Sequence, residues 1–325
     1  MATIDTSNET YFIEPLWRVI DNPQHYSHDV ILYRASDVKW NGTTILEKYI
    51  SGDHNEDIND YHFENSSYHR RDVTDNCDTY NNINNTCVLH LVVDYDFYLN
   101  VGNGDVKTSV YYVLMVIRRI DGMFKATCWD GVGKGIGIQV KKITVHTVRN
   151  TSVSYSNVSK DSGGYGNLLD QLSYGNWDDV CLAHLFTYRE FNSGVVGLAY
   201  VAYQNSSYGG ICSSPKTKAD DNQWRIYNCG FSTYRNNGRT LSLAEASLVT
   251  AHEIGHGFGA HHDNSEIKRC TPAGSSGNYV MYPESLKGDK ENNALFSYCS
   301  KAQVGRVIMN RNNCLKQRDV KSIDN

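Results

Sequence analysis

The part of the sequence with the clearest capacity for chemistry is "AHEIGHGFGAHHD", residues 251–263. His252 and His256 are four residues apart, so at about 3.6 residues per helical turn they share one face of a helix. Two imidazoles placed in this way can bind one Zn²⁺ from the same side. Glu253 lies next to the first of them and can reach a water on the metal. This stretch predicts a zinc site on a helix.

The second half of the stretch supplies a third nitrogen ligand. Gly259 suits a left-handed residue that ends the helix, because it has no Cβ to clash. The chain can then turn back, and His262 completes the pattern HExxHxxGxxH. His261 is off this spacing and is expected to face solvent. Three neutral nitrogen ligands leave one tetrahedral position for water, which is typical of a catalytic site with one Zn²⁺ rather than a structural site.

The chemistry that this site predicts is metal-assisted hydrolysis of an amide. Zinc lowers the pKa of a bound water, and Glu253 can take its proton as the water attacks a polarised carbonyl. Glu253 can then pass that proton to the leaving amine, so no covalent intermediate is needed. Downstream, Met281 lies in "GNYVMYPE" (277–284), flanked by Tyr and Pro. After a zinc helix of this kind, a methionine turn beneath the metal is expected.

The elements that must position these residues alternate between strands and helices. Residues 88–93 form a short apolar run that suits a buried strand, and residues 107–121 have apolar positions at helical spacing. Alternation of this kind predicts an α/β domain with a mostly parallel sheet. The further strands are predicted at 29–35, 135–148, 181–188 and 196–203, and the further helices at 241–259 and 300–312.

Composition excludes several classes of protein. The 325 residues are 40% hydrophobic and 21% charged, which suits a globular protein. With 31 basic and 36 acidic residues and no long basic run, a nucleic-acid partner is not expected. No stretch approaches the roughly 18 apolar residues of a membrane span, so none is expected in this chain. The polar opening "MATIDTSNET" is not a secretory signal peptide.

Cysteines and glycosylation sequons nevertheless favour an extracellular or cell-surface protein that has passed through the secretory pathway. The nine cysteines contain no CxxC pair, which favours disulfides across long loops. Because the opening is not a signal peptide, the sequence is expected to be part of a longer chain. The asparagine sequons are at Asn8, Asn41, Asn65, Asn84, Asn150, Asn157 and Asn205.

The extended zinc motif and the methionine turn together define the metzincins. "HEIGHGFGAHHD" with "YVMYP", and Asp263 after the third histidine, resemble the adamalysin-type ADAM metalloproteases. The stretches "NTCVLHLVVDYDFY", "VCLAHLFTYREF", "GLAYV" and "LFSYCS" are similar to the catalytic domain of the branch of tumour necrosis factor-α converting enzyme. This similarity runs from about residue 84 to 317. The sister branch that cleaves Notch shares several of these motifs and is the nearest alternative.

The resemblance implies a metzincin zinc-protease domain. Its fold is a mixed, mostly parallel five-stranded sheet with helices on both faces and a small C-terminal subdomain after the zinc helix. The implied organisation is a propeptide remnant and processing region at 1–75, a catalytic domain at 76–318 and a tail at 319–325. "YFIEPLWRVI" (11–20) resembles the end of such a propeptide, and the dibasic "YHRRD" (68–72) is the expected processing site.

The resemblance implies three disulfides, and three of the nine cysteines have no place in them. Cys77, Cys128 and Cys229 stand outside this scheme, so two of them can pair and leave one thiol, which could be exposed. Between residues 20 and 75 there is no cysteine in the Pro-before, Gly-after context of an inhibitory cysteine switch, and Cys77 lacks that context. The disulfides implied by the resemblance are Cys87–Cys181, Cys212–Cys314 and Cys270–Cys299.

The resemblance also implies how an extended substrate is held. "GLAYV" is expected to be the edge strand above the cleft, with backbone hydrogen bonds to the substrate from Gly197, Leu198 and Ala199. The residue after the scissile bond is expected to enter an apolar pocket that favours Val, Leu or a similar side chain. The residues implied to line this pocket are Val196, Glu245, Leu248, Val249 and Leu286.

These observations predict a zinc-dependent metalloendopeptidase that sheds or trims extracellular or membrane-anchored proteins. Its expected partners are extended segments of such proteins and its own propeptide. Inactive relatives usually lose the glutamate or a zinc histidine, whereas this chain has all four residues; this disfavours a catalytically silent binding or decoy module. A soluble secreted protease is the third alternative. The residues leave open whether a structural calcium ion is bound.

Overall fold

The protein is described by a computed structural model that covers most of the chain from residue 77 onward. The described residues are 2–5, 10–15, 30–34, 77–80, 82, 84–149, 152–158, 164–217 and 223–318, the first three ranges as backbone only. The predicted processing sequence at 68–72 and the predicted tail at 319–325 lie outside the described residues. So do residues 16–20 of the segment likened to a propeptide.

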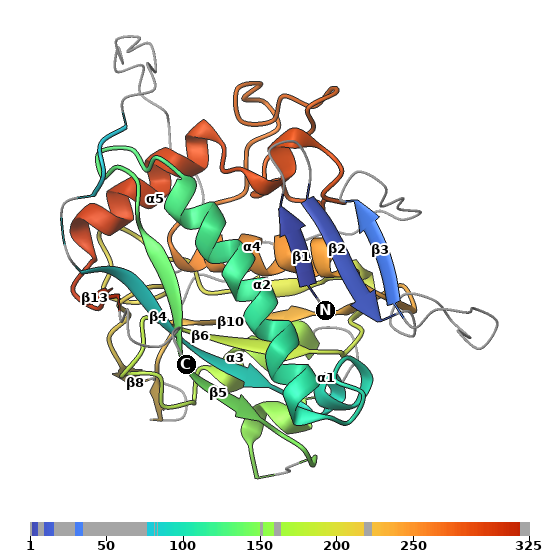
Figure 1. Ribbon diagram of the computed structural model, residues 1–325. Helices are drawn as coiled ribbons and strands as arrows, with labels where there is room; N and C mark the ends of the chain where they lie inside the picture. Colours follow the sequence, from blue (N-terminus) through green and yellow to red (C-terminus); the bar gives the residue numbers. More distant parts are fainter. Residues whose placement is uncertain are drawn as a thin grey trace.

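The central element of the fold is one mixed sheet (Figure 1). Its strands are β4 (Asn84–Val93), β5 (Gly137–Val145), β6 (Leu182–Thr187), β7 (Gly197–Ala199), β10 (Cys229–Thr233) and β13 (Lys316–Gln317). Strand β4 pairs in parallel with β5 on one side and with β6 on the other, and β10 continues in parallel beyond β6. Strand β7 joins β10 antiparallel and ends the sheet. The predicted five-stranded, mostly parallel sheet is confirmed, and β13 adds a sixth, antiparallel strand.

Helices lie on both faces of this sheet, as predicted; they are α1 (Tyr95–Asn100), α2 (Val106–Ala126), α3 (Gly164–Leu172), α4 (Leu243–Gly257) and α5 (Tyr298–Asn310). Successive residues of a strand point to opposite faces. In β4, Leu91 and Val93 therefore belong to the hydrophobic cluster formed with α2 and α4. Val92, between them, belongs to the cluster that contains α3. The sheet separates two hydrophobic cores, and the predicted zinc helix lies on one of them.

A second, smaller sheet lies at the N-terminus. It is antiparallel, in the order β1 (Ala2–Asp5), β2 (Thr10–Pro15), β3 (Val30–Arg34). Its middle strand lies near helix α4, as the blue arrows in Figure 1 show. The remaining short elements are β8 (Lys216–Thr217), β9 (Trp224–Arg225), β11 (Arg235–Asn236), β12 (Arg239–Thr240) and the 3₁₀ turns Ser154–Asn157, Asn192–Gly194 and Glu291–Ala294.

Helix α4 begins and ends at local signals in its own sequence. Ser242 caps the first turn by accepting from the Glu245 N–H, and the Glu245 carboxylate accepts from the Ser242 N–H in return. Every residue from Leu243 to Gly257 is buried, so the helix packs on all its faces. After the helix, Gly259 has φ +96°, the left-handed conformation that the sequence predicts there.

Disulfides connect distant parts of the chain. The three pairs implied by the family resemblance are all present: Cys87–Cys181, Cys212–Cys314 and Cys270–Cys299. A fourth bond joins two of the three remaining cysteines, Cys77 and Cys128. The left-over thiol, Cys229, is buried on β10 rather than exposed.

The conformation of Gly259 leads to a stability prediction. A Cβ on this residue would lie 2.4 Å from Val307 Cγ2 and 2.8 Å from the Ala202 carbonyl oxygen. We expect Gly259→Ala to lower the free energy of unfolding by about 2 kcal/mol or more, because the left-handed backbone and the clash both act against it. The measurement is chemical denaturation of the purified chain.

Gly122→Ala is the matched control. Gly122 is an exposed residue of α2, and nothing lies within 4 Å of a Cβ built on it. Alanine is the better helix former, so this variant should be more stable than the wild type by about 0.5–1 kcal/mol. Equal stability of the two variants would contradict the role assigned to Gly259.

Candidate metal centre

Three histidines converge where helix α4 ends and the chain turns back. His252 and His256 come from the helix, and His262 comes from the segment after Gly259. The ring centroids are 4.6 Å apart for His252 and His256, 5.0 Å for His252 and His262, and 4.9 Å for His256 and His262. One ring nitrogen of each lies within 4.8 Å of the other two. These are the three ligands that the sequence predicts.

Backbone carbonyls hold the two helical rings with one nitrogen toward the centre of the cluster. His252 Nδ1 lies 2.8 Å from the Val280 carbonyl oxygen, and His256 Nδ1 lies 2.7 Å from that of Ala260. Each Nδ1 then carries the ring proton and donates a hydrogen bond to the carbonyl, which leaves Nε2 unprotonated and able to bind a metal. Such partners are common behind metal-bound histidines, where they fix the tautomer.

The cluster as it stands fits a bound cation. His256 Nε2 is buried and has no hydrogen-bond partner among the described residues, and His252 Nε2 lies 3.1 Å from His262 Nε2. Burial lowers the pKa of both His252 and His256 well below the usual value, so the rings are neutral, as metal binding requires. A set of three neutral imidazoles is a donor set that zinc accepts.

Met281 packs directly against the zinc helix. It is fully buried, and a Cβ on Gly255 would lie 2.6 Å from its sulfur. Glycine at position 255 therefore permits the methionine segment to approach the helix between the two histidines. The backbone of this segment also holds the site, because the Met281 carbonyl accepts from the Asp263 N–H at 2.8 Å. This packing is consistent with the predicted methionine turn.

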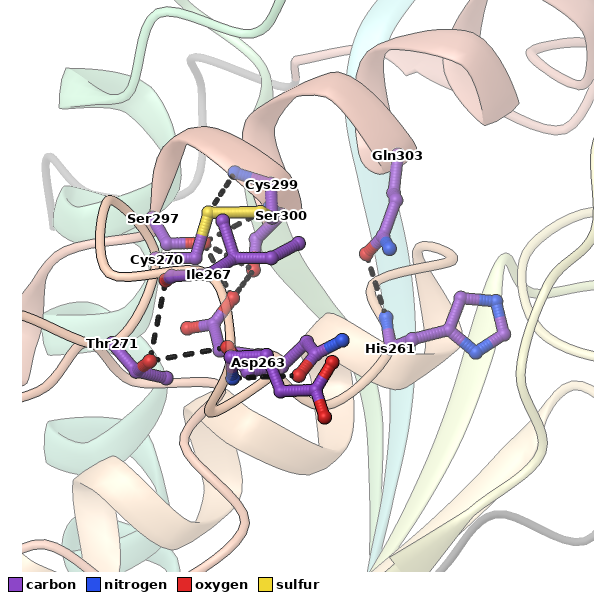
Figure 2. The surroundings of a disulfide bond; sticks show 11 residues. His261, Asp263, Ile267, Cys270, Thr271, Ser297, Cys299, Ser300 and Gln303 are labelled. Atoms are coloured by element: carbon purple, nitrogen blue, oxygen red, sulfur yellow. Dashed lines mark hydrogen bonds between the residues drawn. A yellow bond between two sulfur atoms is a disulfide. The ribbon is translucent and has the colours of Figure 1, made fainter. Parts of the chain in front are cut away.

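The segment after the third ligand is anchored to the start of helix α5 (Figure 2). The buried Asp263 carboxylate accepts from the hydroxyls of Ser297 and Ser300, at 2.5 and 3.1 Å. Burial raises the pKa of Asp263 to about 6. The Cys270–Cys299 disulfide joins the same two segments. The first turn of α5 thus restrains the backbone that carries His262.

His261 differs from its expected solvent-facing position. Its ring is half-buried and packs against Tyr203, with 5.4 Å between the centroids. Its N–H donates to Gln303 Oε1 at 2.9 Å, so this residue too connects the segment to α5 (Figure 2). The sequence spacing correctly separates His261 from the ligand set, but it contains no information on the aromatic neighbour.

The side chain of Glu253 extends from helix α4 to the edge strand β7. This side chain is buried, and burial raises the pKa of its carboxyl well above the usual range. A Cβ on Gly197 would lie only 2.4 Å from Glu253 Oε1, so the strand packs directly on the carboxyl group. Strand β7, with Leu198 and Ala199, pairs with β10 through one edge. No strand of the described chain pairs with its other edge.

A small pocket opens beside His252. Leu248, Val249 and Leu286 line it, as the sequence predicts, together with Val280, Glu284 and Ser285. The other two predicted lining residues lie elsewhere.

Val196 is part of the hydrophobic core, and the Glu245 carboxylate is bound by Ser242 and by both terminal nitrogens of Arg239, each at 3.0 Å. Glu245 caps the helix and does not line the pocket. Val280, Glu284 and Ser285, the lining residues that were not predicted, lie close to Met281 in the sequence. Their proximity to the predicted methionine turn could have identified them.

The comparison with known families agrees with this geometry. The sequence profile of the reprolysin-like metallopeptidases, family M12B, matches residues 107–310. The chain belongs to this family. The match begins at α2 and extends through the zinc helix to the end of α5, so it covers all three histidines, Glu253 and Met281.

Curated relatives of this M12B domain include disintegrin and metalloproteinase domain-containing protein 10 of Homo sapiens, which is 33% identical over 238 residues, covering 71% of this chain and 31% of the relative. The homolog of protein 17 of the same series in Caenorhabditis elegans is 30% identical over 251 residues, covering 70% of this chain and 36% of the relative. The chain thus spans about a third of the length of these relatives. It contains an ADAM-type metalloprotease catalytic domain. In the described residues, no helix is long and apolar enough to cross a membrane.

The histidine cluster predicts the metal content of the protein. Metal analysis of the purified chain should find one zinc ion per molecule, and His256→Ala should lower the bound zinc to a small fraction of that, because it removes one of three protein ligands. His146→Ala is the matched control, since His146 is half-buried, is hydrogen-bonded to Tyr155 and is absent from the cluster. Equal zinc loss in both variants would contradict the assigned ligand set.

Proposed function

We propose that this M12B domain is a zinc-dependent metalloendopeptidase that hydrolyses peptide bonds of extracellular or membrane-anchored proteins, as an ectodomain sheddase does. The observation that supports it is one juxtaposition. Three histidines converge on one point, Glu253 follows the first of them on helix α4 with its side chain buried, and strand β7 packs on its carboxyl group. The histidines are the proposed metal ligands, Glu253 is the proposed proton acceptor, and β7 offers the proposed strand edge for the substrate.

The strand edge is the proposed seat of the substrate. An extended peptide can add to the unpaired edge of a sheet through backbone hydrogen bonds, which needs no particular substrate sequence. Gly197, Leu198 and Ala199 are the residues that would bind it. Because Gly197 packs on Glu253, a peptide on this edge would bring its backbone near the carboxyl group. The next side chain of that peptide would enter the pocket beside His252.

Glu253 is the proposed general base. A bound zinc ion would supply Lewis-acid chemistry, polarising the carbonyl and making water acidic. Glu253 would take the proton of the attacking water and donate it to the leaving amine. Burial away from water suits this task, because it raises the proton affinity of the carboxyl group. With all three ligands and Glu253 in place, a catalytically silent binding module has no support in the described geometry.

The proposed location is outside the cell or at its surface. The four disulfides of the described chain support an oxidising compartment, because such bonds are rare in the cytosol of mesophiles. The seven sequons agree with passage through the secretory pathway.

We also propose that residues 1–75 are a propeptide remnant with its processing region, as the sequence suggests. In support, β2 of the N-terminal sheet lies near helix α4, which carries two of the zinc ligands. This segment could therefore act on the site while it remains attached. The first cysteine of the chain is Cys77, after the dibasic sequence at 68–72.

This arrangement of cysteines predicts the behaviour of the cleaved chain. Cleavage after Arg71 by a dibasic-specific protease should yield two fragments that separate on a non-reducing denaturing gel, because every disulfide lies on the C-terminal side. The control is the same digest under reducing conditions, which should give the same two sizes. Absence of cleavage at this sequence in the folded chain would contradict its proposed role as a processing site.

Replacement of the general base tests the mechanism. Glu253→Ala should lower kcat/KM for a quenched fluorogenic peptide with an Ala-Val junction by about 10²- to 10⁴-fold, the usual contribution of a positioned acid–base group. Zinc content should stay near that of the wild type, because Glu253 is not a ligand. Glu266→Ala, at an exposed glutamate, is the matched control and should leave activity unchanged.

The assay needs one further arm to show that metal is required. A chelator should abolish cleavage by the wild type, and added zinc should restore it. Full activity of zinc-replete Glu253→Ala would exclude Glu253 as the base. Absence of cleavage by the zinc-loaded wild type, before and after cleavage at the dibasic site, would contradict the proposed peptidase function itself.

A further inference from the structure

The pocket beside His252 is less apolar than the family resemblance implies. Leu248 and Val249 of helix α4 and Leu286 form apolar walls. Ser285 and Glu284 also line it, and they follow the methionine turn directly in the chain. Two polar side chains thus belong to a pocket in which a purely apolar substrate side chain was expected.

Ser285 presents a polar atom that lacks a partner. Its Oγ is buried, and among the described residues it makes no hydrogen bond. A buried hydroxyl without a partner destabilises a protein by about 1–3 kcal/mol, so such atoms are few and usually have a reason. At the neighbouring histidine cluster, His256 Nε2 is another such atom, and a bound metal ion would be its partner there. The corresponding explanation for Ser285 is a partner supplied by the substrate.

Glu284 gives the pocket a second property. Glu284 lines the pocket and is exposed, in contrast to the buried hydroxyl of Ser285, so it adds a negative charge to the residues of the pocket. A negatively charged substrate side chain would meet like charge there. An uncharged side chain that ends in a hydroxyl or an amide meets no such penalty, and both groups can bond to a serine hydroxyl, which donates and accepts.

We propose that this pocket recognises an uncharged hydrogen-bonding side chain, such as threonine or asparagine, in the residue that follows the scissile bond, and that Ser285 is the residue that determines this specificity. The inference rests on the proposed peptidase function and specifies its substrate class. Leu248, Val249 and Leu286 contact the apolar part of the side chain, and Ser285 binds its polar end. Glu284 disfavours aspartate and glutamate at the same position.

Matched substrates can isolate the hydrogen bond from size and shape. Valine and threonine have nearly the same shape, as do leucine and asparagine, so each pair differs mainly in polarity. Four quenched peptides that differ only at this position should be compared with the zinc-loaded wild type and with Ser285→Ala. We expect the kcat/KM ratios of threonine to valine, and of asparagine to leucine, to fall by about five- to tenfold in the variant, the worth of one hydrogen bond.

Two control variants accompany this comparison. Ser214→Ala removes an exposed hydroxyl that does not line this pocket, and it should leave both ratios unchanged. Glu284→Gln should raise the cleavage of an aspartate peptide relative to its asparagine counterpart by about two- to fivefold, because it removes a charge near the surface. Thermal unfolding of each variant shows that it is folded.

The outcomes separate this inference from the function on which it rests. If peptides are cleaved but both ratios are the same in the wild type and in Ser285→Ala, the assignment of Ser285 is wrong and the peptidase function stands. If the wild type itself cleaves the valine and leucine peptides more than tenfold faster than their polar counterparts, the proposed preference is also wrong. If no peptide is cleaved by the zinc-loaded wild type, the proposed function fails, and the inference fails with it.

Discussion

The burial of helix α4 is the constraint on which the rest of the site depends. A helix surrounded by protein on all its faces should be apolar, yet this one carries two histidines and two glutamates. Three of these four side chains have a specific partner. Glu245 is bound by the helix N-terminus and Arg239, while His252 and His256 donate to backbone carbonyls. His256 Nε2, which has no partner among the described residues, and the buried carboxyl group of Glu253 are groups that a hydrolytic metal site needs.

Glycines allow the surrounding segments to come close enough to complete the site. A Cβ on Gly197 would collide with Glu253, and a Cβ on Gly255 would collide with Met281. Gly259 turns the backbone so that His262 can face the helix. The edge strand, the methionine turn and the third ligand thus each approach the helix at a position without a side chain. These glycines therefore matter because they allow segments to pack closely at the site, and not because they make the backbone flexible.

Local signals explain how much could be predicted from the sequence. The spacing of the histidines and the turn at Gly259 lie within a few residues of each other, and both predict the observed helix. Strand β10 was not predicted, because "CGFST" has no alternation and is a strand only through its pairing with β6 and β7. The same holds for the Cys77–Cys128 bond, which joins residues 51 positions apart and has no counterpart in the family scheme.

The pocket beside His252 also combines residues that local sequence can predict with residues that only the folded structure identifies. Two residues that the family resemblance implies for the substrate pocket, Leu248 and Val249, line this pocket, and both are one helical turn from His252. The resemblance also includes Glu245, whose carboxylate serves the helix cap and which is absent from the lining of this pocket. It also omits Ser285, whose buried hydroxyl becomes evident only when the methionine turn is folded against the helix. Apolar walls follow from periodicity, whereas an unpaired polar atom depends on every neighbour in three dimensions. Substrate selectivity can therefore differ between relatives whose zinc motifs are the same.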